Sequence, residues 1–254
     1  MNDLEAVEGN VSNSVSEGLA GTGLLQSQEE WGARNEALAK SMSDLVGAYA
    51  VSRTGSALDV GCQAGALTDA LSQTSSFQWS GIDPTIREAT VSPRGNSLLP
   101  ATAAKIPFDD GHFDVALFAN VFEHVVPEER QQSLNEIFRV LRPGGVVVGQ
   151  LPNPYFPIES HSRLPFMGWL PVSWQKVYWR LAPVPWEHDF YVVTMRHLRR
   201  TAEAAGFVTR YVRNFNYPPE VIPRSVRPFA VMLERPMRRF PWAWQFVLER
   251  PVGT

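Results

Sequence analysis

The chain has 254 residues, a length that accommodates one α/β domain with a buried core and one additional element. Its formal net charge of −3 provides no basic field that would hold nucleic acid, so we expect no nucleic-acid partner. The single cysteine, Cys62, excludes an internal disulfide and is typical of a reducing compartment, which favours a cytoplasmic location.

Residues 1–28 are rich in Ser, Gly, Asn and Glu, a composition that favours a flexible N-terminal arm. A flap that orders on ligand binding is the alternative. The acidic N-terminus lacks the apolar core of a signal peptide, and no apolar run approaches the ~20 residues of a membrane-spanning helix. We therefore expect residues 29–254 to form a single domain that does not cross a membrane.

Apolar periodicity then predicts alternating helices and strands. A helix is expected over 29–50 and a short one after Pro84. In chain order the other elements are a strand over 57–60, a helix over 65–74, strands over 77–83, 97–99 and 113–118, a helix from about 127 to 142, a strand over 146–151, a helix over 194–205, and strands over 207–213 and 242–249. This alternation predicts an α/β fold with a doubly wound, mostly parallel sheet of seven strands.

The glycine turn after the first strand is the strongest functional signal. Gly61 and Gly65 follow a short buried strand and open a helix, so a ligand could lie close to bare backbone there. Asp59 stands at the strand end, where it could orient the turn or accept a ligand ammonium. The next strand ends in Asp83, which is well placed to bind two ribose hydroxyls. The sequence therefore predicts a ligand that carries a nucleoside.

A dinucleotide is disfavoured as that ligand. A nicotinamide-binding turn would have glycines at its first, third and sixth positions, which are Gly61, Gln63 and Ala66 here. Ala66 is tolerable, but the Gln63 side chain would crowd a pyrophosphate. A nicotinamide oxidoreductase therefore remains a weaker alternative.

Three further segments indicate a family. Residues 105–116 contain a Pro-Phe pair and end in a strand that begins Phe-Asp, and residues 120–125 leave that strand. Residues 135–145 form a helix, a stop and two glycines. With the glycine turn, these blocks resemble the class I S-adenosylmethionine-dependent methyltransferases over roughly residues 50–215. Gln63 departs from the family pattern, which has a glycine at that position.

The resemblance implies a Rossmann-like methyltransferase fold, with a last strand antiparallel to the others, and S-adenosyl-L-methionine as cofactor. An acid that often follows the third strand of the family is replaced here by Thr102, which leaves the backbone of Ala103 and Ala104 to contact the adenine. The residues expected at the cofactor are Asp59, Gly61, Cys62, Gln63, Gly65, Asp83, Pro84, Thr102, Ala103, Ala104 and Asn120.

An aromatic-rich insertion is expected over about 152–190, because prolines interrupt the pattern there and Trp169, Trp174, Trp179 and Trp186 follow. We expect it to cap the carboxyl ends of the strands, where open α/β sheets bind ligands. A small helical hairpin packed on the sheet is the alternative. Residues 218–241 mix arginines with apolar residues and favour a solvated surface, with weak peripheral membrane contact as the other reading.

Base candidates lie near both regions. His124 follows the fourth strand, and imidazole titrates near neutral pH. Glu159 and His161 are two residues apart in the insertion, so in an extended segment they would share one face. These residues with Glu123 could instead hold a divalent cation, but we expect no metal.

The resemblance thus predicts an enzyme that transfers a methyl group to a small-molecule acceptor, with a hydroxyl oxygen expected as the accepting atom. The aromatic insertion favours an acceptor with a ring or apolar portion, such as a phenol, a quinone precursor, a glycoside or a secondary metabolite. The alternative from another class is a catalytically inactive binding or scaffold protein of the same fold, which the departures at Gln63 and Thr102 make worth testing. Oligomeric state is left open.

Overall fold

The computed structural model describes residues 28–157, 159–160, 164–182, 190–218 and 240–253. Two compact units result, one containing residues 154–189 and the other residues 28–153 and 190–254. The expected N-terminal arm, His161, Trp186 and almost all of the segment 218–241 lie outside the described residues.

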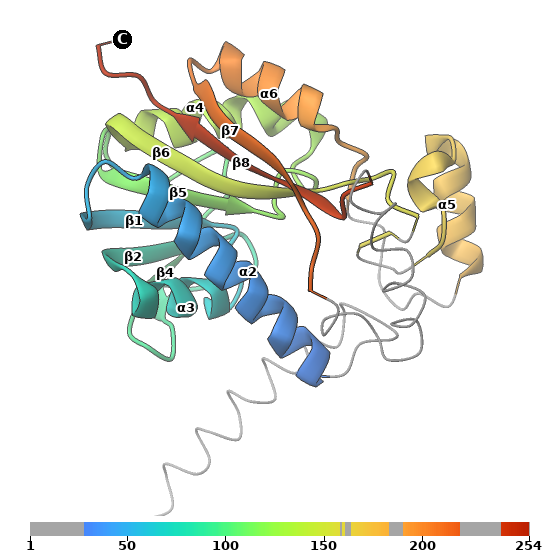
Figure 1. Ribbon diagram of the computed structural model, residues 1–254, viewed down its shortest axis with the longest axis horizontal. Helices are drawn as coiled ribbons and strands as arrows, with labels where there is room; N and C mark the ends of the chain where they lie inside the picture. The colour runs from blue at the N-terminus through green and yellow to red at the C-terminus, as the bar shows by residue number, and fades with distance from the viewer. Residues whose placement is uncertain (1–27, 158, 161–163, 183–189, 219–239, 254) are drawn as a thin grey trace, which may run out of the picture. The chain divides into compact units, whose positions relative to one another are not determined.

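The larger unit is an α/β sheet (Figure 1). Its helices are α2 (Gln28–Tyr49), α3 (Ala66–Thr74), α4 (Arg130–Val140) and α6 (Met195–Ala204), with a 3-10 turn, η1 (Pro127–Glu129). Its strands are β1 (Thr54–Val60), β2 (Ser76–Asp83), β3 (Thr90–Val91), β4 (Ser97–Pro100), β5 (Phe113–Ala119), β6 (Leu141–Pro152), β7 (Val208–Phe215) and β8 (Ala243–Glu249).

The described residues form an eight-stranded sheet with the order β3-β4-β2-β1-β5-β6-β8-β7. Strands β4, β2, β1, β5 and β6 are parallel to their neighbours in this run, whereas β8 is antiparallel to both β6 and β7. The doubly wound fold and the antiparallel last strand are confirmed. The additional strand is the two-residue β3, which forms one edge of the sheet beside β4 and is too short to leave a periodic signal.

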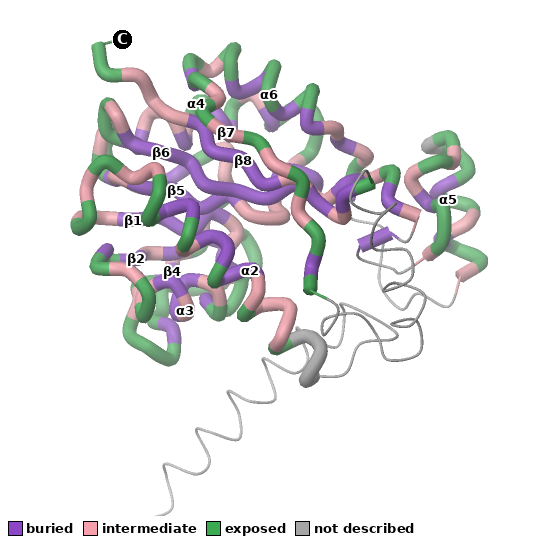
Figure 2. Tube along the Cα trace, in the orientation of Figure 1, coloured by how far each residue is buried: buried purple, intermediate pink, exposed green. Residues whose placement is uncertain are grey.

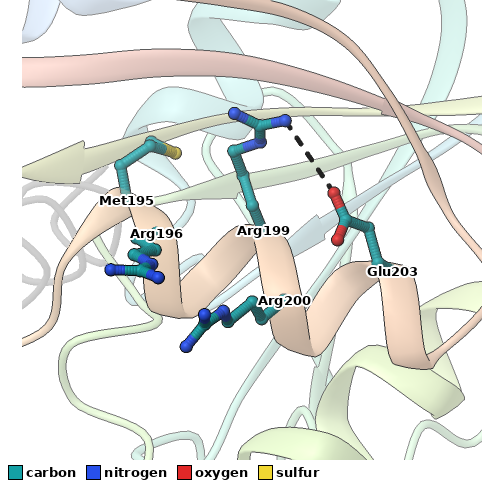
Figure 3. Close-up of a pocket in the computed structure, with 5 residues that line it drawn as sticks. All are labelled: Met195, Arg196, Arg199, Arg200 and Glu203. Carbon is teal, nitrogen blue, oxygen red and sulfur yellow. Dashed lines mark ion pairs between the residues drawn. The ribbon is translucent and has the colours of Figure 1, made fainter.

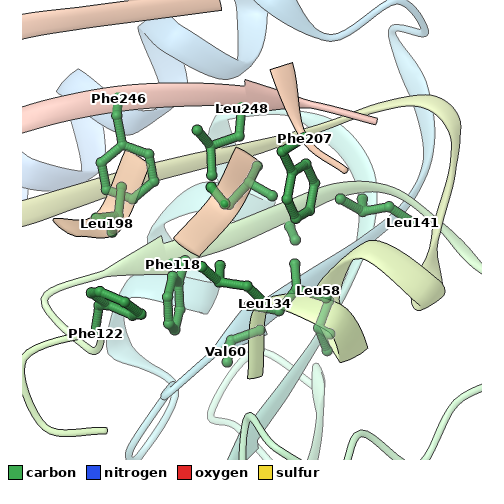
Figure 4. Packing of buried hydrophobic residues seen from close by; sticks show 14 of the residues in the cluster. Leu58, Val60, Phe118, Phe122, Leu134, Leu141, Leu198, Phe207, Phe246 and Leu248 are labelled. Carbon is green, nitrogen blue, oxygen red and sulfur yellow. The ribbon is translucent and has the colours of Figure 1, made fainter. Parts of the chain in front are cut away.

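Two apolar cores sandwich the sheet. On one face α2 and α3 pack around Met42, Leu71 and Trp79, and on the other α4 and α6 pack around Ile137 and Leu198 (Figure 1). Figure 4 shows the second core, where Phe118, Leu134 and Phe246 interdigitate, and Figure 2 shows the buried central strands. Each buried side chain of this size contributes about 1.5–3 kcal/mol, so the sheet is a rigid platform for the residues at its edge.

Two local predictions are wrong. No helix follows Pro84, because the Asp83 carboxylate accepts the Thr85 N–H at 2.8 Å and holds a turn that competes with helix. Helix α4 ends at Val140 rather than 142, and β6 begins at once. The Arg250 guanidinium donates to the carbonyls of Phe138 and Leu141, so a distant residue satisfies the helix end.

The smaller unit contains the 3-10 turn η2 (Met167–Trp169) and the helix α5 (Val172–Leu181). Several of its large apolar side chains are exposed, among them Trp174 at 65% and Leu181 at 81%. Trp179 is buried. Trp174, Val177 and Leu181 recur at helical spacing, so they form one exposed apolar stripe on α5. None of the described helices is both long enough and apolar enough to span a membrane.

Candidate functional site

The residues predicted to bind the cofactor converge at one edge of the sheet. Parallel strands end at the same edge, and β4, β2, β1 and β5 are consecutive neighbours. The four strands are followed by the segments that carry the predicted residues. Asp59 lies in β1 and the loop 61–65 follows it; Asp83 ends β2 and Pro84 follows it. Thr102–Ala104 follow β4, and Asn120 follows β5.

The loop after β1 is pinned to β2. The Gly61 and Cys62 N–H groups both donate to the Ile82 carbonyl, at 2.8 and 3.1 Å. Gly61 and Gly65 have φ angles of 82° and 83°, and Gln63 between them has a φ of 50°. Gln63 therefore adopts the left-handed conformation that glycine occupies at lower cost. The side chain departs from the family pattern, but the backbone keeps the conformation that a glycine would favour.

The glycines also make room for protein neighbours. A Cβ at Gly61 would lie 2.4 Å from Val121 Cγ2, and one at Gly65 would lie 3.0 Å from Leu98 Cδ1. Sequence reasoning attributed these glycines to ligand approach and missed Val121 and Leu98, because a pattern shows where a side chain is absent but not what fills the space. The glycine turn thus locks β1, β4 and the segment after β5 together.

Two buried carboxylates stand beside this loop. Asp83 Oδ2 accepts the Gln63 N–H at 2.9 Å, and Asp59 Oδ2 accepts the Thr68 hydroxyl at 2.6 Å. Burial raises the pKa of Asp59 to about 7; the Thr68 hydrogen bond opposes this and the Asp83 charge adds to it. Burial, together with the negative charges of Asp59 and Asp83, raises the pKa of the Cys62 thiol, which therefore stays protonated at neutral pH. Sequence reasoning missed Thr68, which has no signal beyond a polar residue on a buried helix face.

These carboxylates fit a cationic nucleoside better than a dinucleotide. Asp83 Oδ2 accepts the Gln63 N–H, and Oδ1 accepts both the N–H and the hydroxyl of Thr85. Because each carboxylate oxygen has two lone pairs, one acceptor position remains, on Oδ2, for a ribose hydroxyl. Negative charge at this edge attracts a sulfonium or ammonium group and repels a pyrophosphate. These two acidic hydrogen-bond acceptors therefore fit S-adenosylmethionine.

The segment after β4 offers mainly backbone. Thr102 is bridged to Lys105, whose N–H donates to the Thr102 carbonyl at 3.1 Å. Ala103 and Ala104 are in the turn between them and are only half-buried. That arrangement is consistent with a contact made by backbone groups rather than by an acidic side chain.

The base candidates belong to different units. His124 lies in the loop after β5 and is half-buried. Its backbone N–H donates to the Val121 carbonyl at 2.9 Å. Glu159 belongs to the smaller unit, is 7% exposed, and accepts the Ser160 hydroxyl at 3.3 Å. Within the described ranges no three metal-ligating side chains come together. The catalytic roles of His124 and Glu159 stay predictions.

A separate cavity of about 260 Å³ lies on α6 (Figure 3). Its lining comes from this helix alone: Met195, Arg196, Arg199, Arg200 and Glu203. None of the predicted site residues contributes to it. The Arg199–Glu203 ion pair at 3.8 Å is exposed, so this cavity is a surface groove between flexible side chains.

Comparisons with known proteins agree with this geometry. A family model described as a methyltransferase domain matches residues 58–149. An uncharacterized methyltransferase of Mycobacterium sp. (strain KMS) is 37% identical over 94 residues, which cover 36% of each chain. The chain thus spans about a third of the length of that relative. A demethylmenaquinone methyltransferase of Staphylococcus aureus (strain JH9) is 30% identical over 175 residues, covering 63% of this chain and 70% of that protein.

The fold has solved counterparts. The Burkholderia thailandensis 1,6-didemethyltoxoflavin-N1-methyltransferase, solved with bound 1,6-didemethyltoxoflavin and S-adenosylhomocysteine, superposes with a TM-score of 0.57 at 15% identity, covering 99% of this chain and 91% of that one. This likeness concerns the fold alone. With the sequence matches and the site at the edge of β4, β2, β1 and β5, it leads to one conclusion: the chain belongs to the class I S-adenosylmethionine-dependent methyltransferases.

Proposed function

We propose that this protein transfers a methyl group from S-adenosylmethionine to a hydroxyl oxygen of a small molecule that has a ring or a substantial apolar portion. The observation that carries the methyltransferase assignment is the convergence of the loop 61–65, Asp59 and Asp83 at one edge of the sheet. The cofactor, when bound, supplies an electrophilic methyl group on a sulfonium. The protein's task is then to align the acceptor, exclude water and accept a proton.

Each residue at the edge has a proposed task. Asp83 accepts a hydrogen bond from the ribose through its remaining Oδ2 lone pair, and the backbone of Thr102–Ala104 contacts the adenine. Gly61 and Gly65 shape the loop, Asp59 orients the turn through Thr68, and Cys62 fills the space against Gly81.

His124 is the proposed general base. An imidazole nitrogen of His124 accepts the proton that the acceptor hydroxyl loses as its oxygen takes the methyl group, and imidazole is suited to this near neutral pH. Glu159 and His161 are the alternatives from the insertion. The test is whether turnover depends on the histidine of the sheet unit or on the acid of the insertion.

Two features support an acceptor with a ring or apolar portion. The insertion exposes Phe166, Trp169 and Trp174 by more than half, an aromatic surface suited to flat apolar molecules. In addition, the staphylococcal relative is named for a quinone acceptor.

Calorimetry with S-adenosylhomocysteine tests the assignment. Wild-type protein should bind it, and Asp83→Ala should weaken binding by a few kcal/mol, because a charge-assisted contact is lost. Asp109→Ala, which removes an exposed acid, is the matched control and should bind like wild type. Failure of wild type to bind at millimolar ligand would favour the inactive scaffold, and unchanged affinity in Asp83→Ala would remove the ribose assignment.

A further inference from the structure

A line of polar side chains crosses four neighbouring strands and ends at the proposed site. Arg213 on β7, Gln245 on β8 and Gln150 on β6 are direct register partners across the sheet, and Gln150 is paired with the last residue of β5. Gln150 and Gln245 are only 2% and 0% exposed. Buried amides of this kind are costly unless their donors and acceptors are paired.

The hydrogen bonds along this line all run in one direction. The Arg213 Nε donates to Gln245 Oε1 at 2.8 Å, and the Gln245 Nε2 donates to Gln150 Oε1 at 3.1 Å. The Gln150 Nε2 then donates to Asn120 Oδ1 at 3.1 Å and to the Tyr217 hydroxyl at 2.9 Å. We name Arg213, Gln245 and Gln150 the amide relay.

The charged end of the relay fixes the orientation of every amide in it. A guanidinium has donors only, so Gln245 must turn its oxygen toward Arg213 and its NH₂ group toward Gln150. Ser41 on α2 reinforces this by donating its hydroxyl to the same oxygen at 2.9 Å. Gln150 must then offer its NH₂ group to Asn120. The oxygen of Asn120 is therefore engaged, and its NH₂ group is left to act as a donor.

Asn120 lies where the far part of the ligand would reach. It follows β5 with a φ of 57°, is half-buried, and precedes Val121, which packs against Gly61. In the sheet order, Thr102–Ala104 follow β4, Asp83 ends β2, and Asn120 follows β5 on the other side of β1. A ligand with its base at β4 and its ribose at β2 extends its remaining part toward β5. For S-adenosylmethionine, that part is the amino-acid moiety.

We propose that the amide relay is a positioning device that makes Asn120 a hydrogen-bond donor to the carboxylate of the cofactor's amino-acid moiety. Gln150 and Arg213 are positioning residues in this arrangement, because they act through Asn120. The inference rests on the proposed function and adds the recognition of one end of the ligand.

The test compares two ligands that share an adenosine thioether. S-adenosylhomocysteine has the amino-acid moiety, and 5′-methylthioadenosine lacks it. Gln150→Glu keeps the shape and still accepts from Gln245, but a carboxylate has no N–H for Asn120 Oδ1. Asn120 then rotates to donate to the new carboxylate and turns its oxygen toward the ligand. Calorimetry should show affinity for S-adenosylhomocysteine reduced by about 10- to 100-fold, the size expected for a hydrogen bond to a charged group.

Affinity of this variant for 5′-methylthioadenosine should change by less than about twofold, since no contact to adenosine is altered. The matched control is Gln78→Glu, the same substitution at an exposed position of β2, which should leave both affinities unchanged. Equal losses for both ligands would mean a merely structural role and would overturn the proposal, as would no loss for either.

A second variant covers a failure of Gln150→Glu to fold. Arg213 is half-buried, so the fold should tolerate Arg213→Met. This substitution removes the guanidinium that orients the amides of the relay. It should lower affinity for S-adenosylhomocysteine selectively, whereas Arg213→Lys retains a donor and should restore part of it. If wild type binds neither ligand, the proposed function fails; if it binds both equally well, only the relay's role fails.

Discussion

The sheet edge and the insertion present opposite kinds of surface. At the sheet edge the polar groups are committed before any ligand arrives, with Asp59 bonded to Thr68 and Asp83 bonded to the loop. In the insertion, by contrast, large apolar side chains such as Trp174 and Leu181 face solvent. If the proposed function holds, the cofactor is bound by fixed backbone geometry, and we expect the acceptor to depend on the side-chain composition of the insertion.

The strongest way to break this comparison is to disturb the fixed half. Gly61→Ala should lower the free energy of unfolding by roughly 2–5 kcal/mol. About 1–2 kcal/mol comes from a left-handed backbone that alanine disfavours, and the rest from the collision of Cβ with Val121 at 2.4 Å. Urea unfolding measures the loss, and affinity for S-adenosylhomocysteine should fall with it.

Gly95→Ala separates the two causes. Gly95 has the same φ of 82°, but a Cβ there would meet nothing within 4 Å. This variant should lose only the backbone contribution of about 1–2 kcal/mol. Equal losses in the two variants would show that the contact with Val121 has no energetic weight, and the loop would not be locked as described.

The next largest effect concerns whether the sheet unit or the insertion supplies the general base. His124→Ala should lower turnover by ~10²-fold, the usual contribution of a general base, and leave affinity for S-adenosylhomocysteine nearly intact. Glu159→Gln, in the insertion, is the matched comparison and should keep most activity. Turnover is measured by the production of S-adenosylhomocysteine with each candidate acceptor. Wild-type activity in His124→Ala, with a loss in Glu159→Gln, would move the base to the insertion.

The sequence was most informative where a pattern maps directly onto backbone. The loop 61–65 and the acid at the end of β2 could be predicted because glycine spacing and buried runs constrain the backbone itself, whereas the antiparallel direction of β8 was expected from the family resemblance. The relay from Arg213 to Asn120 could not, since Gln150 and Gln245 are polar residues within apolar strands and only the register brings them together. The turn at Pro84 was missed for a similar reason, because the Asp83 side chain competes with the expected helix.

The most gradual effect concerns the protonation of Asp59, whose pKa burial raises to about 7 from an ordinary value of 3.8. Between these two values the folded state binds a proton that the unfolded state has lost, so this group makes stability fall as pH rises toward 7 and has no further effect above it. The slope from this one group is at most about 1.4 kcal/mol per pH unit.

Asp59→Asn removes the titration and tests that slope. We measure its free energy of unfolding in urea from pH 4 to 8. The difference between the variant and the wild type should shift in favour of the variant as pH rises and become constant above about pH 7. Asp109→Asn controls for the loss of one negative charge at an exposed position and should follow the wild-type curve throughout. A constant difference between Asp59→Asn and wild type would show that Asp59 is ionised across this range. The sheet edge would then hold two buried negative charges, on Asp59 and Asp83. Together they would attract a sulfonium more strongly than the edge does when Asp59 is protonated.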